Sequence, residues 1–183
     1  MAEELLEKIP PEKRWAITAK TLTAFVVLRG DKIIAPQLGI EEGVIAPVMG
    51  AEKWDEINDK VFCEGGKVFY PWVKEMFNIP VKDAIGAYKL LIVVETLLSG
   101  PEQEHKLVEA TPERVVSRLT KCPWWERYQE FDVHSEHRAC DAADQKHQEE
   151  GLKAVSPKLT FKLTKTRQGG YPYCEYVIEL KDE

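Results

Sequence analysis

The sequence of 183 residues is 44% hydrophobic and 31% charged, which is the composition of one folded domain and not of a disordered chain. A formal net charge of -6 and a pI near 5.4 give the molecule a field that repels phosphate backbones and anionic membrane surfaces. We therefore expect neither nucleic acid nor a membrane as its partner.

The sequence also lacks the usual signals of export. Its first residues, MAEELLEKIPPEKRW, are acidic and amphipathic, without the basic and apolar regions of a signal peptide. The longest apolar run, LLIVVETLL (90–98), is interrupted by Glu95 and is shorter than the about 20 residues that a membrane-spanning helix needs. The four cysteines are widely spaced and form no CxxC pair, which favours reduced thiols over a disulfide framework. We therefore predict a cytoplasmic protein.

Helical periodicity dominates residues 1–100. The stretch 12–29 predicts a core helix. From 51 to 78 the apolar side chains keep helical spacing, and we expect either two helices or one kinked helix because a Gly-Gly pair at 65–66 interrupts the pattern. The stretch 81–99 predicts a buried helix that ends at a Gly-Pro pair.

Residues 101–183 change to the two-residue period of β-strands. The runs EHKLVEA (104–110) and ERVVSRLTK (113–121) flank a Thr-Pro turn and predict one antiparallel hairpin. The runs PKLTFKLTKT (157–166) and YCEYVIEL (173–180) flank RQGGYP and predict a second hairpin.

A helix from about Val133 to Glu150 is predicted between the hairpins. Asp132 is a good N-cap, and Gly151 is typical of the position after a helix end. The resulting β-β-α-β-β order predicts an α+β fold with a single domain, 1–183. In it, the N-terminal helical part, 1–100, packs on a four-stranded antiparallel sheet formed by 101–183.

One side of this predicted helix is polar where an apolar side is expected. The residues on that side are three or four apart along the chain: His137, Cys140, Asp144 and His147. His134 lies beside them. Such neighbours are close enough to share one metal ion or one substrate. The competing interpretation is that the alanines of this helix pack inward and the polar side chains face water.

The cysteines offer a second reason to expect a site. Cys122 ends a predicted strand, and Cys174 begins the last strand on its apolar face. With Cys140 and His137 they would form a tetrahedral zinc site, because thiolate and imidazole are the ligands that zinc prefers. A metal-free alternative is thiol catalysis by Cys140, His137 and Asp144. Buried cysteines are also common as small hydrophobic residues, which is our interpretation of Cys63.

Three further residues are candidates for binding a small molecule. Trp124 and Trp125 follow Cys122 closely and could form the wall of a pocket. Arg118 could bind a carboxylate. Each also has an ordinary explanation, as a packed aromatic side chain or as an arginine that faces water.

The segments ERVVSRLTKCPWW, CDAAD and LKAVSPKLTFKLTKTRQGGYPYCEYVIEL resemble the L-2-amino-thiazoline-4-carboxylic acid hydrolase-like family over roughly residues 104–181. The matching positions are Cys122, Cys140 with Asp144, and Cys174 with Glu175. The resemblance implies hydrolytic opening of a thiazoline ring. The spacing from Cys140 to Asp144 is one residue longer than in that family, and His134 and His137 are additions to its pattern.

Two functional hypotheses follow. In the first, the protein is a small-molecule hydrolase: a thiolate or a metal-bound water attacks the C=N carbon, His137 moves the proton and Asp144 orients the imidazole. In the second, the same Cys/His cluster belongs to a non-catalytic module that binds a metal, zinc being the candidate, or a small ligand. A purely structural role for these residues is a third interpretation. The N-terminal helices would either form a homodimer surface or close the pocket.

Overall fold

The computed structural model describes residues 13, 51–132 and 142–181. The elements in chain order are α5 (Ala51–Met76), α6 (Ala84–Ser99), β1 (Glu104–Ala110), β2 (Arg114–Lys121), α7 (Pro123–Glu130), α8 (Ala142–Val155), β3 (Leu159–Lys165) and β4 (Cys174–Leu180). This arrangement confirms the predicted α+β fold. The predicted helix at 12–29 lies outside the described residues, apart from the helical residue Lys13.

The four strands form one antiparallel sheet in the order β1-β2-β4-β3. Both predicted hairpins are therefore confirmed, and the sheet is completed by β2 pairing with β4. In that central pair Ser117 lies opposite Tyr176, and Leu119 lies opposite Cys174. Because side chains alternate along a strand, these four residues share the face of the sheet that points toward the helices.

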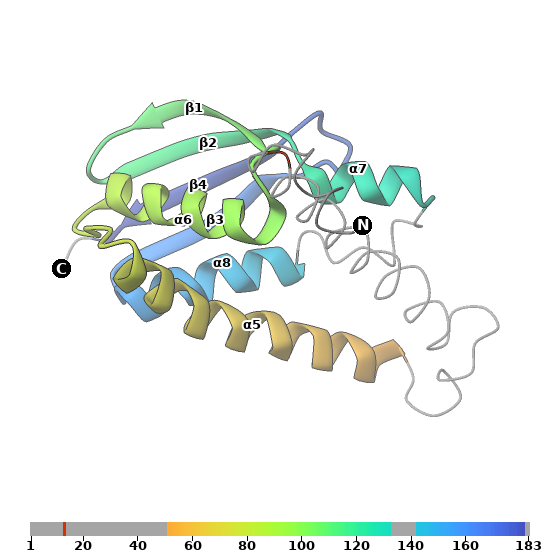
Figure 1. The fold of residues 1–183 in the computed structure, drawn as a ribbon, viewed down its shortest axis with the longest axis horizontal. Helices are drawn as coiled ribbons and strands as arrows, with labels where there is room; N and C mark the ends of the chain where they lie inside the picture. The colour runs from red at the N-terminus through yellow and green to blue at the C-terminus, as the bar shows by residue number, and fades with distance from the viewer. Residues whose placement is uncertain (1–12, 14–50, 133–141, 182–183) are drawn as a thin grey trace, which may run out of the picture.

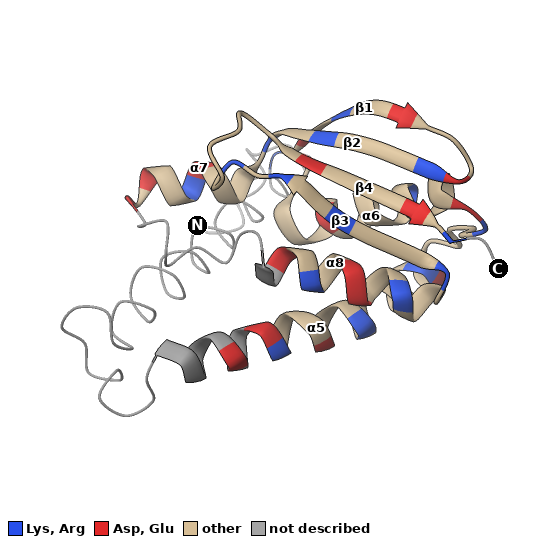
Figure 2. Cartoon of the chain, turned by 180° about the vertical axis from the view of Figure 1, so that it is seen from behind, with Lys and Arg blue, Asp and Glu red and all other residues tan. Residues whose placement is uncertain are grey.

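The helices cover one face of the sheet in two layers (Figure 1). α6 and α8 contact the strands, and α5 packs against α8 and α6. The core between these layers includes Tyr70, Val73, Leu90, Leu91, Val94, Leu152, Phe161 and Ile178. On the opposite face, the Arg and Lys side chains of β2 and β3 lie on either side of the Glu side chains of β4 (Figure 2).

α5 is one continuous helix, so the Gly-Gly pair at 65–66 does not divide it. A Cβ atom on Gly66 would overlap the carbonyl oxygen of His147 in α8 and would lie 3.1 Å from the backbone nitrogen of Gly151. Gly151, in turn, faces the ring of Tyr70, which a Cβ would approach to 2.6 Å at Cγ. The two glycines therefore allow α5 and α8 to pack with their backbones in close contact.

The segment between the hairpins contains a helix that was not predicted, α7, and a second helix, α8, that ends later than predicted. α7 begins directly after Cys122 with Pro123 in its first turn, where proline is well tolerated because the first amides of a helix have no intrahelical acceptor. α8 continues past Gly151 to Val155, so the prediction that Gly151 follows the helix end is wrong. The close contact with Tyr70 accounts for a glycine at this internal position. Residues 133–141 lie outside the described part of the chain.

Candidate functional site

The centre of the site is Glu95, which points from α6 into the core. Its helix, α6, is capped by Asp83, whose carboxylate accepts a hydrogen bond from the Gly86 amide (2.7 Å). The inner side of α6 is otherwise strongly apolar. Glu95 is only 5% exposed. A carboxyl group at such a depth needs polar partners, because burying it without them costs several kcal/mol.

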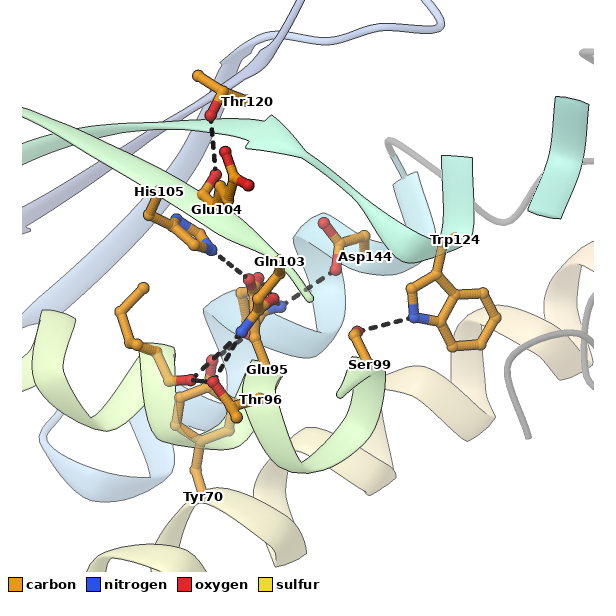
Figure 3. A network of polar contacts seen from close by, with 12 residues as sticks. Tyr70, Glu95, Thr96, Ser99, Gln103, Glu104, His105, Thr120, Trp124 and Asp144 are labelled. Carbon is orange, nitrogen blue, oxygen red and sulfur yellow. Dashed lines mark hydrogen bonds and ion pairs between the residues drawn. The ribbon is translucent and has the colours of Figure 1, made fainter. Parts of the chain in front are cut away.

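Those partners come from three other elements. Oε2 of Glu95 lies 3.1 Å from Nε2 of His105 on β1, and Oε1 accepts a hydrogen bond from Nε2 of Gln148 on α8 (3.0 Å). The same Gln148 nitrogen also donates to Oδ1 of Asp144 (3.1 Å), and the Tyr70 hydroxyl donates to Oε1 of Gln148. We call these five residues the Glu95 network (Figure 3).

Aromatic rings enclose the His105 end of the network. The ring centroid of His105 lies 5.7 Å from that of Tyr176 and 6.4 Å from that of Tyr88. Burial, assisted by the charges of Glu95 and Asp144, raises the pKa of the Tyr176 hydroxyl well above its usual value. Nδ1 of His105 is buried and has no hydrogen-bond partner among the described residues. The site thus combines an apolar wall with a buried polar atom that has no hydrogen-bond partner among the described residues.

Tyr70 closes the other end of the network at α5. Burial, again assisted by Glu95 and Asp144, raises the pKa of its hydroxyl well above the usual value. The group is therefore neutral at physiological pH and acts as a hydrogen-bond donor to Gln148.

Cys122 and Cys174 lie close to this network, both on the side of the sheet that faces the core. Burial, assisted by the nearby Cys174, Glu95 and Asp144, raises the pKa of the Cys122 thiol to about 12, although a hydrogen bond with the Trp125 backbone acts in the opposite direction. Cys122 is therefore a neutral thiol and a poor nucleophile. Cys122 and Cys174 therefore lie on the same side of the sheet, while the predicted convergence of both with Cys140 stays a prediction because Cys140 lies outside the described residues.

The other predicted ligands cannot be placed. Cys140 and His137 lie outside the described residues, as does His134. Among the residues that the structure does describe, no group of three or more His, Cys, Asp or Glu side chains could hold a metal ion. The zinc site formed by Cys122, Cys140, Cys174 and His137 stays a prediction.

The polar stripe predicted on α8 is present where the structure describes it, at Asp144 and His147. His147 is 9% exposed, and its Nδ1 lies 3.1 Å from the carbonyl oxygen of Phe62 in α5. Burial lowers the pKa of this imidazole, although the Phe62 carbonyl and Glu95 act in the opposite direction. His147 therefore belongs to the α5–α8 contact, whereas Asp144 belongs to the Glu95 network.

The predicted substrate-binding residues are divided between two places. Trp124 and Trp125 pack around the buried Tyr128 in a separate small cluster, and Trp124 Nε1 donates to the Ser99 hydroxyl (2.8 Å), which ties α7 to the end of α6 (Figure 3). Arg118 lies on the other face of the sheet.

There Nε of Arg118 donates to Glu175 (2.8 Å), and its guanidinium lies 4.6 Å from the centroid of the Tyr173 ring. Burial alone would raise the pKa of Glu175, but hydrogen bonds from Arg118, Lys165 and Thr164 lower it to about 2. Arg118 is therefore part of a salt-bridge cluster and does not line the same site as the cysteines.

Four members of the Glu95 network were not identified from the sequence: Tyr70, Glu95, His105 and Gln148. One signal for them exists, since Glu95 interrupts an otherwise apolar helical run. An acidic residue on the buried side of a helix indicates a partner elsewhere in the core. The partners themselves have no sequence pattern, because they lie 10 and 53 residues away along the chain.

An open groove runs along the edge strand β3. Its volume is about 350 Å³, and its lining residues are Gln145, Leu163, Thr164, Lys165, Thr166, Gly169 and Tyr171. Gln145 accepts a hydrogen bond from the Leu163 amide (3.3 Å), and Leu163 also packs against the core. The groove therefore approaches the core from the α8 side.

No family model matches the sequence, and no curated protein matches it. Among solved structures, the fold is similar to that of the phenol-responsive sensory domain of the transcription activator PoxR with phenol, at 9% identity and a TM-score of 0.51, over 86% of this chain and 74% of that one. It is also similar to a trafficking protein particle complex subunit 3 from Naegleria fowleri, covalently bound to palmitic acid, at 11% identity and a TM-score of 0.59, over 89% and 97% of the two chains. At these identities the similarity shows a shared fold.

Proposed function

We propose that this protein is a non-catalytic module that binds a small molecule, with the Glu95 network as its recognition site. The observation that carries the proposal is the buried carboxyl group of Glu95, held by His105 and Gln148 inside an apolar core. A buried ionisable cluster is a costly way to stabilise a core, since well-packed apolar side chains often serve as well or better. Clusters of this kind concentrate at functional sites.

The ligand class follows from the surroundings of the site. Rings of Tyr88 and Tyr176 and the aliphatic core would contact an apolar body, and Nδ1 of His105 would bond to one polar group of the ligand. We therefore propose a mainly apolar molecule with a single hydroxyl or carboxyl group. The two structural neighbours support this class, because one structure contains phenol and the other protein is covalently bound to palmitic acid.

The hydrolase hypothesis and the zinc site are kept as further proposals. Hydrolysis of a thiazoline ring by a thiol would require Cys140, because Cys122 is too weakly acidic to supply a thiolate unaided. Zinc bound by Cys122 and Cys174 with Cys140 and His137 would deprotonate the thiols. Metal analysis of protein purified without chelator distinguishes a metal-binding from a metal-free site.

No helix in the described residues is long and apolar enough to cross a bilayer. We propose a cytoplasmic location, in which the described cysteines Cys63, Cys122 and Cys174 stay free thiols.

The proposal is tested by titrating the protein with phenol and with palmitate, following heat or tryptophan fluorescence. Glu95→Gln should weaken binding at least about 10-fold, or about 1.4 kcal/mol, because it removes the carboxylate that positions His105 and Gln148. Glu175→Gln is the matched control, since it makes the same change on the opposite face of the sheet, and it should bind like the wild type. Failure of both probes to bind, or equal weakening by both variants, would refute the proposed site.

A further inference from the structure

The two ring nitrogens of His105 have different surroundings. The side chain is 7% exposed and lies on β1 opposite Leu119 of β2, with Nε2 at 3.1 Å from Oε2 of Glu95. Nδ1 is also buried, and it has no hydrogen-bond partner among the residues that the structure describes. The rings of Tyr88 and Tyr176 lie beside the imidazole. The chemistry of Nδ1 therefore decides which polar group of a ligand could bind at this place.

The partner of Nε2 fixes where the hydrogen of the ring lies. A neutral imidazole carries this hydrogen on one nitrogen, and the other nitrogen is an acceptor. A carboxylate oxygen only accepts, so Nε2 of His105 must carry the hydrogen when Glu95 is ionised. The Gln148 amide, which donates to Oε1 of Glu95 (3.0 Å), favours the ionised form. Nδ1 of His105 is then an acceptor, and its partner must be an O–H or N–H group.

The charge around the site disfavours a ligand carboxylate. Burial raises the pKa values of the Tyr70 and Tyr176 hydroxyls well above their usual range, and the negative charges of Glu95 and Asp144 act in the same direction. Negative charge that disfavours a tyrosinate at these positions disfavours the anion of a ligand for the same reason. A ligand carboxylate would also have to move from water into a core of apolar and aromatic side chains. A neutral donor carries neither penalty.

We propose that the Glu95 network selects its ligand by a neutral hydroxyl group, which donates a hydrogen bond to Nδ1 of His105, and that it rejects carboxylates. This inference rests on the proposed function and narrows its ligand class from a hydroxyl or carboxyl group to a hydroxyl group. Glu95 is a positioning residue in this arrangement, because it acts on the ligand through His105. It holds the ring hydrogen at Nε2 and so makes Nδ1 the acceptor.

Calorimetric titrations at pH 8 with phenol, anisole and benzoate test this selection. Anisole has a methyl group in place of the phenol hydrogen, and benzoate is ionised at this pH. Phenol should bind at least about 10-fold more tightly than anisole, which leaves the buried Nδ1 unpaired, and at least about 10-fold more tightly than benzoate. Anisole or benzoate that binds as tightly as phenol would overturn the inference, as would palmitate that binds where phenol does not, although the proposed function would stand. If none of these ligands binds, the proposed function fails as well.

Glu95→Gln tests why Nδ1 is the acceptor. Gln148 donates to Oε1 of Glu95, so the oxygen of the new amide must take that place, and its NH2 group must face His105. Nε2 then has to accept, and the ring hydrogen moves to Nδ1. A donating Nδ1 bonds to the oxygen of phenol and of anisole alike, so the ratio of their affinities should fall toward one, whereas Glu175→Gln should keep the wild-type ratio. A ratio that Glu95→Gln leaves unchanged would overturn the inference, because a steric effect of the anisole methyl group would persist in the variant.

Nitrogen-15 NMR of the histidine rings at pH 8 locates the hydrogens directly and needs no ligand. His105 should carry its hydrogen on Nε2. His147 is the internal reference with the opposite form, because its Nδ1 faces the Phe62 carbonyl oxygen (3.1 Å), which only accepts. In Glu95→Gln the hydrogen of His105 should move to Nδ1, while His147 stays unchanged, and the same spectra show whether the variant is folded. A wild-type His105 with its hydrogen on Nδ1, or on both nitrogens, would overturn the inference.

Discussion

Alanine at Gly66 would test how α5 and α8 are packed, and this packing positions Gln148 and Asp144 in the candidate site. The new methyl group would overlap the His147 carbonyl oxygen and lie 3.1 Å from the Gly151 nitrogen. Both are backbone atoms, so no side chain can rotate to make room. The two helices would have to separate.

The expected magnitude follows from two opposing terms. Replacing glycine by alanine inside a helix contributes about 1 kcal/mol of helix propensity, whereas forcing an extra methyl group into a packed contact costs typically 1–3 kcal/mol and occasionally more. Because the backbone must move, we expect the cost of inserting the methyl group to be at or above the upper end of that range. Gly66→Ala should therefore lower the free energy of unfolding by about 2 kcal/mol, or about 4–8 °C in melting temperature for a chain of this size.

The neighbouring glycine provides the control. A Cβ atom on Gly65 would lie 3.6 Å from Nδ1 of His147, which is an ordinary contact. Gly65→Ala should therefore keep the propensity gain and raise the stability by about 0.5–1 kcal/mol. Urea unfolding followed by circular dichroism, at one fixed protein concentration, measures both variants. If Gly66→Ala is as stable as Gly65→Ala, α5 and α8 do not pack as described.

Three further predictions concern single side chains. Glu175→Gln should lower the free energy of unfolding by about 1 kcal/mol at neutral pH, a modest value because the partners of Glu175 are partly exposed. Since the native pKa of about 2 lies below the usual one, this stability is present above about pH 5 and is lost as the pH falls toward 2. The melting curves of wild type and variant should therefore converge in acid, and a constant difference would contradict the ion-pair explanation. Cys122, with a pKa of about 12, should react with iodoacetamide at pH 8 about 1,000-fold or more slowly than a free thiol, because little thiolate is present. Rapid labelling in peptide mass mapping would contradict its burial. Tyr70→Phe should lower the free energy of unfolding in urea by about 1–2 kcal/mol, because it leaves Oε1 of Gln148 without its donor. An unchanged midpoint of the urea unfolding curve would show that this hydrogen bond contributes nothing to stability.

The order of the elements could be derived from the sequence because it depends on local patterns. Alternating apolar residues identified the strand at 159–165 almost to the residue, since a sheet with one covered face imposes a period of two. The β-rich run before the Thr-Pro turn identified the strand at 104–110. The same alternation placed Cys174 on the inner face. A long apolar run with a glycine stop identified α6. Each of these signals lies within about 20 consecutive residues.

The candidate site depended on the tertiary structure. The cysteines and histidines were the natural candidates by residue type, yet the buried polar network of the core is built on Glu95 and Gln148, whose partners come from α5, β1 and α8. The partner of a buried polar group is fixed by strand register and helix docking, and neither has a period along the chain. The pair at 65–66 shows the same limit: glycine disfavours a helix by itself, but close contact with α8 makes glycine the residue that this helix needs at position 66.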